Sequence, residues 1–186
     1  HARHRFLPAM RRVPEAPVDV SVQSIPCQER RALVPKRSAG LLMYRGAGAD
    51  LAVLLVHPGG PFWRGKDIGA WSIPKGEIEE GADTLATARR EFEEETGSRV
   101  DGAFFALKPL KQKSGKLVHG WALQGDIDAS SITSNTFSME WPPRSGKEQE
   151  FPEVDRGGWF TIAAAREKIL PGQLGFIDQL EEHISS

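Results

Sequence analysis

Four glutamates within five residues are the part of this sequence best suited to chemistry. Glu91, Glu93, Glu94 and Glu95 fall in the last turns of a helix predicted over residues 84–96. The C-terminal end of a helix carries a partial negative charge, so acidic side chains there are unfavourable. Spacings of three and four residues place Glu91, Glu94 and Glu95 on one side of the helix. A divalent cation with oxygen ligands converts this repulsion into binding, and the run therefore predicts a metal site.

The residues at both ends of this segment define the helix that must position the glutamates. Asp83 is a favourable N-cap, and Gly97 follows the last helical residue, where glycine commonly ends a helix. Apolar or small residues recur at intervals of three and four, which predicts a face buried against a sheet. The residues of this predicted buried face are Leu85, Ala88, Phe92 and Thr96.

Short apolar runs separated by turn residues predict a sheet around this helix. We expect strands over 39–44, 51–56, 71–74, 103–107, 116–124 and 154–160, and further helices over 161–169 and 173–184. The Gly- and Pro-rich segment 57–70 is expected to be a functional loop, and 76–82 and 125–150 are also expected to be loops. Strands mixed with helices predict an α/β (α+β) layered fold.

Composition limits the classes to which the protein can belong. The hydrophobic share of 39% and charged share of 26% are those of a globular protein, and Cys27 alone excludes an intramolecular disulfide. No run approaches the ~20 apolar residues of a membrane span, so we expect a cytoplasmic protein without a membrane partner. No particular oligomeric state is indicated.

Charge is distributed unevenly along the chain. Residues 1–37 contain eight Lys or Arg and three Asp or Glu, although the net charge of the whole chain is −1. We interpret 1–37 as a basic, disordered extension and 38–186 as the folded domain. Because the domain itself is acidic, we expect no nucleic-acid partner.

The sequence from Gly76, GEIEEGADTLATARREFEEETGS, resembles the Nudix box, G-x5-E-x7-R-E-U-x-E-E-x-G-U with U apolar. Two positions depart from the pattern: Ala82 stands where the box has its first Glu, and Ser98 occupies the final apolar position. The segment 71–76 (WSIPKG) also resembles the residues that precede the box in many members. The positions that match the box are Gly76, Arg90, Glu91, Phe92, Glu94, Glu95 and Gly97.

The resemblance implies a Nudix-type αβα sandwich with a mixed central sheet, in which the box forms a loop-helix-loop, so that 38–186 is a Nudix hydrolase domain. It also implies Mg²⁺ as cofactor, with Mn²⁺ able to replace it. Glu91, Glu94 and Glu95 would be its side-chain ligands, completed by a backbone carbonyl at Lys75 or Gly76. Arg90 would orient a glutamate by ion pairing, and Glu94, Glu95 and Arg90 belong to the predicted catalytic set.

Several family members have a further catalytic acid six residues before a Trp, and counting back from Trp159 gives Glu153. Glu148 and Glu150 are alternatives on the same segment. For the substrate we expect phosphate contacts from Lys75, Arg64 and Lys66, and stacking of a nucleobase on Trp63 or Trp141, together with Phe62. His57 and His119 are interpreted as structural. The lysines of the 108–116 stretch fit either a phosphate-binding ridge or a solvated hairpin, of which we favour the hairpin.

The function predicted from these residues is Mg²⁺-dependent hydrolysis of a phosphoanhydride in a nucleoside-diphosphate-linked substrate. Dinucleoside polyphosphates such as diadenosine tetraphosphate are favoured over nucleoside triphosphates and nucleotide sugars. Ala82 motivates an alternative, a Nudix-fold nucleotide-binding or regulatory module with weak or lost turnover. A third hypothesis, a hydrolase that contacts RNA through residues 1–37, depends on the basic extension.

Overall fold

The computed structural model describes residues 36–186. Most of the predicted extension, residues 1–35, lies outside the described residues, and Arg37 is the first residue of strand β1. The strands are β1 (Arg37–Arg45), β2 (Ala52–Pro58), β3 (Lys75–Glu77), β4 (Phe105–Lys111), β5 (Leu117–Gln124), β6 (Thr136–Glu140), β7 (Glu148–Pro152) and β8 (Val154–Thr161). The helices are α2 (Thr84–Thr96), α3 (Ile162–Lys168) and α4 (Leu174–Ile184), with 3-10 turns η1 (Gly48–Asp50), η2 (Ala129–Ser131) and η3 (Pro171–Gln173).

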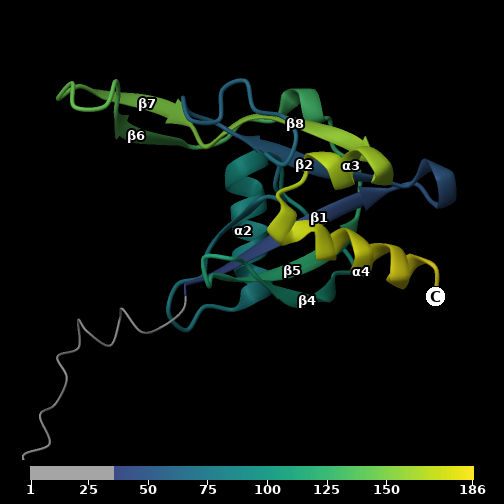
Figure 1. The fold of residues 1–186 in the computed structure, drawn as a ribbon. Helices are drawn as coiled ribbons and strands as arrows, with labels where there is room; N and C mark the ends of the chain where they lie inside the picture. Colours follow the sequence, from purple (N-terminus) through teal and green to yellow (C-terminus); the bar gives the residue numbers. More distant parts are fainter. Residues whose placement is uncertain (1–35) are drawn as a thin grey trace, which may run out of the picture. The chain divides into compact units, whose positions relative to one another are not determined.

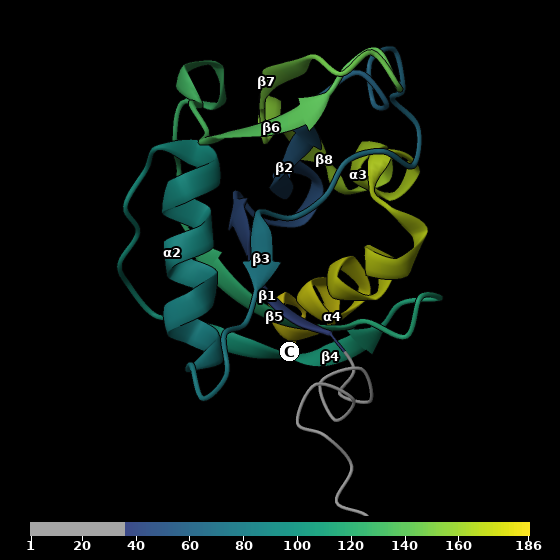
Figure 2. The same ribbon diagram turned by 90° about the vertical axis from the view of Figure 1, so that its left-hand side faces the viewer.

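The central sheet is mixed and has helices on both faces. Its strand order is β4-β5-β1-β2-β8, and β3 also pairs with β1. β1 and β5 are parallel, whereas the other pairs are antiparallel. Helix α2 covers one face, and α3 and α4 lie on the opposite face (Figures 1 and 2). The predicted αβα sandwich with a mixed sheet is confirmed.

Alternating side chains of β1 supply both hydrophobic cores. Leu41 and Met43 point to the α2 side and pack in a cluster with Phe92 of the helix. Leu42, between them, belongs to the second cluster, which includes Phe176 and residues of α3 and α4. Since successive side chains of a strand point to opposite faces, an apolar run in β1 indicates a strand buried on both sides.

Helix α2 has the ends predicted from its sequence. The Asp83 carboxylate accepts a hydrogen bond from Ala86 N–H at 2.8 Å, which satisfies one free donor of the first turn. Gly97 has a φ of +73° and its N–H donates to Glu93 C=O, in the left-handed conformation that commonly ends a helix. Of the residues predicted to form the buried face, Ala88, Phe92 and Thr96 are buried, whereas Leu85 is only partly buried. Thr87, which was not predicted to face the core, is also buried.

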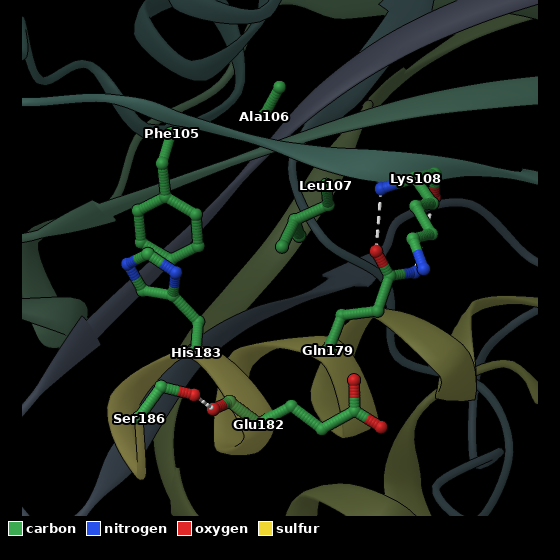
Figure 3. A pocket seen from close by; sticks show the side chains of 8 residues that line it. All are labelled: Phe105, Ala106, Leu107, Lys108, Gln179, Glu182, His183 and Ser186. Carbon is green, nitrogen blue, oxygen red and sulfur yellow. Dashed lines mark hydrogen bonds between the residues drawn. The ribbon is translucent and has the colours of Figure 1, made fainter.

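Helix α4 lies against the edge strand β4 (Figure 3). Phe105 and His183 stack with ring centroids 3.8 Å apart. The Gln179 amide accepts from Lys108 N–H at 2.5 Å and donates to Lys108 C=O at 3.2 Å, so it satisfies backbone groups on the free edge of the sheet. The shallow pocket between β4 and α4 is lined by Phe105, Ala106, Leu107, Lys108, Gln179, Glu182, His183 and Ser186, none of which belongs to the predicted site.

Two parts of the predicted strand pattern are wrong. Segment 125–150 was predicted to be loop, but it contains most of a two-stranded sheet of β6 and β7, whose pairing runs from Thr136↔Pro152 to Glu140↔Glu148. Segment 71–74 was predicted to be a strand, but it makes only isolated bridges, and the strand begins at Lys75. No helix between residues 36 and 186 is long and apolar enough to span a membrane.

Candidate active site at the end of helix α2

Arg90 joins two of the three glutamates on the site face of α2. Its Nη2 lies 2.7 Å from Glu91 Oε1 and its Nη1 lies 2.9 Å from Glu94 Oε2. The Glu91 side chain is 12% exposed and that of Glu94 is 35% exposed. Glu93 points elsewhere and pairs with Arg99 at 2.7 Å. The helix therefore separates Glu93 from the other acids, as the three- and four-residue spacing predicts.

Strand β3 lies directly against these carboxylates. A Cβ added to Gly76 would be 1.9 Å from the carboxyl carbon of Glu91, so only glycine leaves room for that side chain. The adjacent Lys75 N–H donates to Glu95 Oε2 at 3.2 Å. The segment that leads into β3 is held by Gln173, whose fully buried amide accepts from Ile73 N–H at 3.0 Å and donates to Ser72 Oγ at 3.0 Å.

Glu153 is tied to the same helix end by backbone hydrogen bonds. Asn135 N–H donates to Glu94 C=O at 3.1 Å, and Glu153 N–H donates to Asn135 C=O at 2.9 Å. Gly59 N–H then donates to Glu153 C=O at 2.9 Å. Asn135 therefore connects the last turn of α2 to the start of β8.

The acids at this end of α2 interact electrostatically with one another. Burial raises the pKa of Glu95 to about 8, and the charges of Glu91 and Glu153 add to this effect, while Lys75 opposes it. Burial also raises the pKa of Glu91, with Glu94 and Glu153 adding to the rise and Arg90 opposing it. A group of buried carboxylates with raised pKa values is often found at functional sites.

Comparison with known proteins assigns this arrangement to a family. A family model for the NUDIX domain matches residues 34–180. An RNA pyrophosphohydrolase of Caulobacter vibrioides is 40% identical over 139 residues, covering 68% of this chain and 78% of that protein. The chain belongs to the Nudix hydrolase family. The predicted enzyme class, a Nudix pyrophosphohydrolase, is confirmed at the level of this family.

Two further similarities to known proteins are more limited. An octanoyltransferase of Myxococcus xanthus is 29% identical over 139 residues, covering 73% of this chain, but the chain spans only 33% of that protein. An Ap4A hydrolase of C. elegans has the same fold, with a TM-score of 0.56 at 19% identity, covering 80% of this chain and 98% of that one. At this identity the structural likeness shows the fold alone.

The acids of the Nudix box have the chemistry of a Mg²⁺ site. Their donors are all oxygens, which Mg²⁺ prefers, and the burial of Glu95 and Glu91 beside other carboxylates is a repulsion that a cation relieves. Within residues 36–186, no three acidic, His or Cys side chains already have the geometry of a metal site. In this arrangement the carboxylates of Glu91 and Glu94 are ion-paired with Arg90.

Ala82, the main departure from the Nudix box, lies before the helix. Its N–H donates to Glu79 C=O at 3.0 Å in a turn, and it is exposed. The helix begins only at Thr84, and the seven residues from there to Glu91 rise by roughly 10 Å along the helix axis. The carboxylates in the second half of α2 are therefore held by contacts that do not involve position 82.

The predicted substrate residues fall into separate groups. Lys75 lies beside Glu95, and Arg64 is exposed on the 57–70 loop. Lys66 Nζ lies 4.9 Å from the ring centroid of Trp63, which packs against the core under α3 and α4. Trp141, at the end of the β6–β7 hairpin, instead contacts Phe62 with centroids 5.5 Å apart. Trp63 and Trp141 thus do not form one stacking pair.

The base of the 57–70 loop is anchored by His57, which is fully buried in β2. Its Nδ1 lies 2.8 Å from Asp155 Oδ1, and its Nε2 lies 2.8 Å from Lys66 C=O. Both contacts are within the protein, in keeping with the structural role predicted for this histidine.

Sequence reasoning missed the residues that support the site from outside the Nudix box. Asn135 acts through its backbone, so its side chain gave no signal. Gln173 left a weak signal, a polar residue directly before an amphipathic helix. The four acids of the site and Arg90 were all predicted from spacing and resemblance.

Proposed function

We propose that this chain is a Mg²⁺-dependent hydrolase that cleaves a phosphoanhydride bond in a nucleoside-diphosphate-linked substrate. The observation that carries the proposal is the convergence of Glu91, Glu95 and Glu153: burial raises the pKa of Glu95 and of Glu91, and the charge of Glu153 adds to both rises. Buried negative charges without a full set of cationic partners are costly. Because a divalent ion removes this cost, the site is suited to bind a metal with its polyphosphate ligand.

Each residue of the site has a distinct role in this proposal. Glu91, Glu94 and Glu95, with a backbone carbonyl at Gly76, hold the ion. When bound, the ion supplies positive charge that neutralises phosphate oxygens and polarises the P–O bond. Arg90 orients Glu91 and Glu94. Glu153 accepts the proton of the attacking water at its carboxylate, and the Lys75 ammonium binds a phosphate.

The position of Trp141 supports a long substrate. Lys147 C=O accepts from Trp141 N–H, and the five residues of β7 lie between Lys147 and Glu153, so that these two residues are separated by at most about 20 Å of extended chain. A nucleoside diphosphate bound at the acids is too short to stack its own base on Trp141. A dinucleoside polyphosphate such as diadenosine tetraphosphate carries a second base and suits this distance.

RNA with a 5′ polyphosphate is a second candidate substrate. It is favoured by the 40% identity to a protein described as an RNA pyrophosphohydrolase, and it also has nucleotides beyond the cleaved bond. The acidic domain argues against extensive contact with nucleic acid. The two substrates are distinguished by comparing hydrolysis of diadenosine tetraphosphate with that of a 5′-triphosphorylated oligonucleotide.

The alternative, a binding or regulatory module without turnover, makes the opposite prediction for activity. Ala82 is its only support, and that residue is outside the contacts that hold the acids. Tight nucleotide binding without release of product in the presence of Mg²⁺ would favour the module.

A substrate panel with matched variants tests the proposed function. Chromatography of the products should show Mg²⁺-dependent release of nucleotides by the wild-type chain. Glu94→Gln and Glu95→Gln should each reduce the rate by about a hundredfold or more. Glu93→Gln is the control, because Glu93 lies on the same helix but pairs with Arg99. Full activity of Glu95→Gln would contradict the proposal.

A further inference from the structure

The side chain of His57 lies between two groups that can only accept a hydrogen bond. It is fully buried, and its Nδ1 lies 2.8 Å from a carboxylate oxygen of Asp155. Its Nε2 lies 2.8 Å from the backbone carbonyl oxygen of Lys66. A neutral imidazole carries one N–H and satisfies one of these acceptors, whereas an imidazolium carries two N–H groups. The geometry therefore calls for a second proton at this position.

The second proton belongs to the ring rather than to Asp155. A carboxyl group is a far stronger acid than an imidazolium, and the Asp155 side chain is 32% exposed, so water solvates its negative charge. An imidazolium beside a carboxylate is a paired charge, which is the form in which buried charges are tolerated. Without the second proton, one ring nitrogen of His57 would face an oxygen at 2.8 Å with no hydrogen between them.

A β-bulge in β8 directs Asp155 toward the ring. His57 of β2 pairs with Arg156 of β8. The next residue of β2, Pro58, pairs with Val154, so Asp155 is the extra residue of the bulge. Bulges often occur next to active sites, where they redirect a side chain. The irregular register of β8 thus brings this carboxylate to the histidine.

Other charged residues on the elements around the ring have partners of their own. They are Lys66 and Asp67 of the loop, Arg156 of β8 and Lys168 of α3. Asp67 and Lys168 form an ion pair at 2.5 Å. The Arg156 guanidinium lies 5.3 Å from the ring centroid of Trp71, and the Lys66 ammonium lies 4.9 Å from that of Trp63. Asp155 is therefore the acid that pairs with His57.

The two contacts of the ring join the 57–70 loop to β8. Next to the contact with the β8 carboxylate, Gly59 N–H donates to Glu153 C=O at 2.9 Å. The contact with Lys66 C=O holds the far end of the loop segment that carries Phe62, whose side chain is 58% exposed. The histidine thus connects the backbone around the proposed base to a loop that faces solvent.

We propose that His57 is a positioning residue for the hydrolysis, and that as an imidazolium it holds the 57–70 loop and the Glu153 end of β8 together. This inference rests on the proposed function and adds to it a charged residue outside the Nudix box. Loss of one proton leaves one of the two acceptors without a donor, so the loop or Asp155 moves away from the ring. The alignment of Glu153 with the attacking water then weakens, which lowers kcat as the pH rises.

Nitrogen NMR of the imidazole rings tests the charge of His57 without any turnover. At about pH 7, the full chain without metal should show one ring with protons on both nitrogens that is missing from the spectrum of His57→Gln. The chain contains five histidines. His183→Gln is the matched control, because it changes an exposed histidine on α4 and should leave the charged ring in the spectrum. A neutral ring at His57 would overturn the inference.

The pH dependence of kcat at saturating Mg²⁺ tests the positioning role. His57→Gln should lower kcat by about 10- to 100-fold, because its amide replaces the donor at one ring nitrogen and not at both. Asp155→Asn should remain active, since its amide donates to Nδ1 while Nε2–H still donates to Lys66 C=O, so that a neutral ring satisfies both contacts. The fall in kcat with rising pH should therefore disappear in Asp155→Asn.

Asp67→Asn is the control for the loss of a carboxylate, because Asp67 pairs with Lys168 instead of the ring; it should keep the fall in kcat. An equal fall in Asp155→Asn and the wild-type chain would overturn the inference. The two proposals fail separately. Full activity of Glu95→Gln with an imidazolium at His57 would remove the proposed function and leave the charged bridge. A neutral His57 in a Mg²⁺-dependent hydrolase would remove the bridge alone.

Discussion

The Glu91 carboxylate rests against the α-carbon of Gly76, where a Cβ would be 1.9 Å from the carboxyl carbon. Gly76 is not among the glycines with a positive φ, so the backbone conformation does not require glycine at this position. Glycine is required because any larger side chain would collide with the Glu91 carboxylate. This contact connects the first residue of the Nudix box to the helix fifteen positions later. It explains why a glycine and a glutamate at this spacing occur together.

Gly76→Ala is expected to reduce activity by about a hundredfold, because a catalytic carboxylate displaced by about 1 Å loses that much. The fold should persist, since alanine is compatible with the backbone at this position. Activity and thermal unfolding are the measurements. Gly81→Ala is the matched control: Gly81 has a φ of +78° and open space around it, so alanine should cost about 1–2 kcal/mol of stability and preserve activity. The reverse ranking of activities would contradict this explanation.

Arg90→Lys is expected to lower metal affinity or activity by about 10- to 100-fold. Lysine keeps the charge but lacks the planar fork that contacts Glu91 at 2.7 Å and Glu94 at 2.9 Å. Mg²⁺ titration of the hydrolysis rate measures the effect. Arg89→Lys serves as control, because Arg89 contacts Asp101 at 3.6 Å outside the site. If both variants behave alike, Arg90 does not position the glutamates.

Stability of the metal-free protein should decrease as pH rises toward about 8. Burial raises the pKa of Glu95 from 4.5 to about 8, so between these values the folded state keeps a proton that the unfolded chain releases. The stabilisation is fully present below pH 4.5 and is lost as the pH rises through the folded pKa. Mg²⁺ affinity should rise over the same range, because the metal needs the carboxylate.

Thermal unfolding in a chelator, from about pH 5 to 9, measures this dependence. The melting temperature of the wild-type chain should fall with pH more steeply than that of Glu95→Gln, which has no proton to lose at this position. Glu91, whose pKa is also raised, should leave a smaller slope in the variant. Parallel curves for the two proteins would show that Glu95 does not carry the effect.

Local sequence patterns predicted most of the fold because its main elements are buried. The apolar runs of β1 and β2, and the caps Asp83 and Gly97 of α2, have strong local causes. The β6–β7 hairpin was missed because it forms a separate sheet whose side chains are exposed or partly buried, so that burial did not impose a regular apolar alternation on both strands. Its turn, with Pro142 and Pro143, also resembles an irregular loop.

The residues of the site also divide into those that a local pattern predicts and those that only long-range contacts reveal. The box acids and Arg90 follow from helical spacing, which is a local property. The links through Asn135 and Gln173 depend on tertiary contacts over long separations, for which a single sequence carries little signal. Likewise, the distinction between Trp63 and Trp141 required the fold, because both lie in Gly- and Pro-rich segments that read alike as loops.

Trp141→Ala is expected to raise KM for a long substrate by roughly tenfold, the effect of one lost stacking contact. KM for a nucleoside triphosphate should be unchanged, because its base does not extend from the acids to the hairpin end, which lies up to about 20 Å of extended chain from Glu153. Diadenosine tetraphosphate, a 5′-triphosphorylated oligonucleotide and ATP are the substrates to compare, with kcat and KM determined for each. Phe62→Ala should produce the same pattern, since the ring centroids of Phe62 and Trp141 lie 5.5 Å apart.

Trp63→Phe is the control, because Trp63 packs against the core and a large ring preserves that contact. A rise in KM for ATP alone, or none for either long substrate, would exclude Trp141 from base recognition.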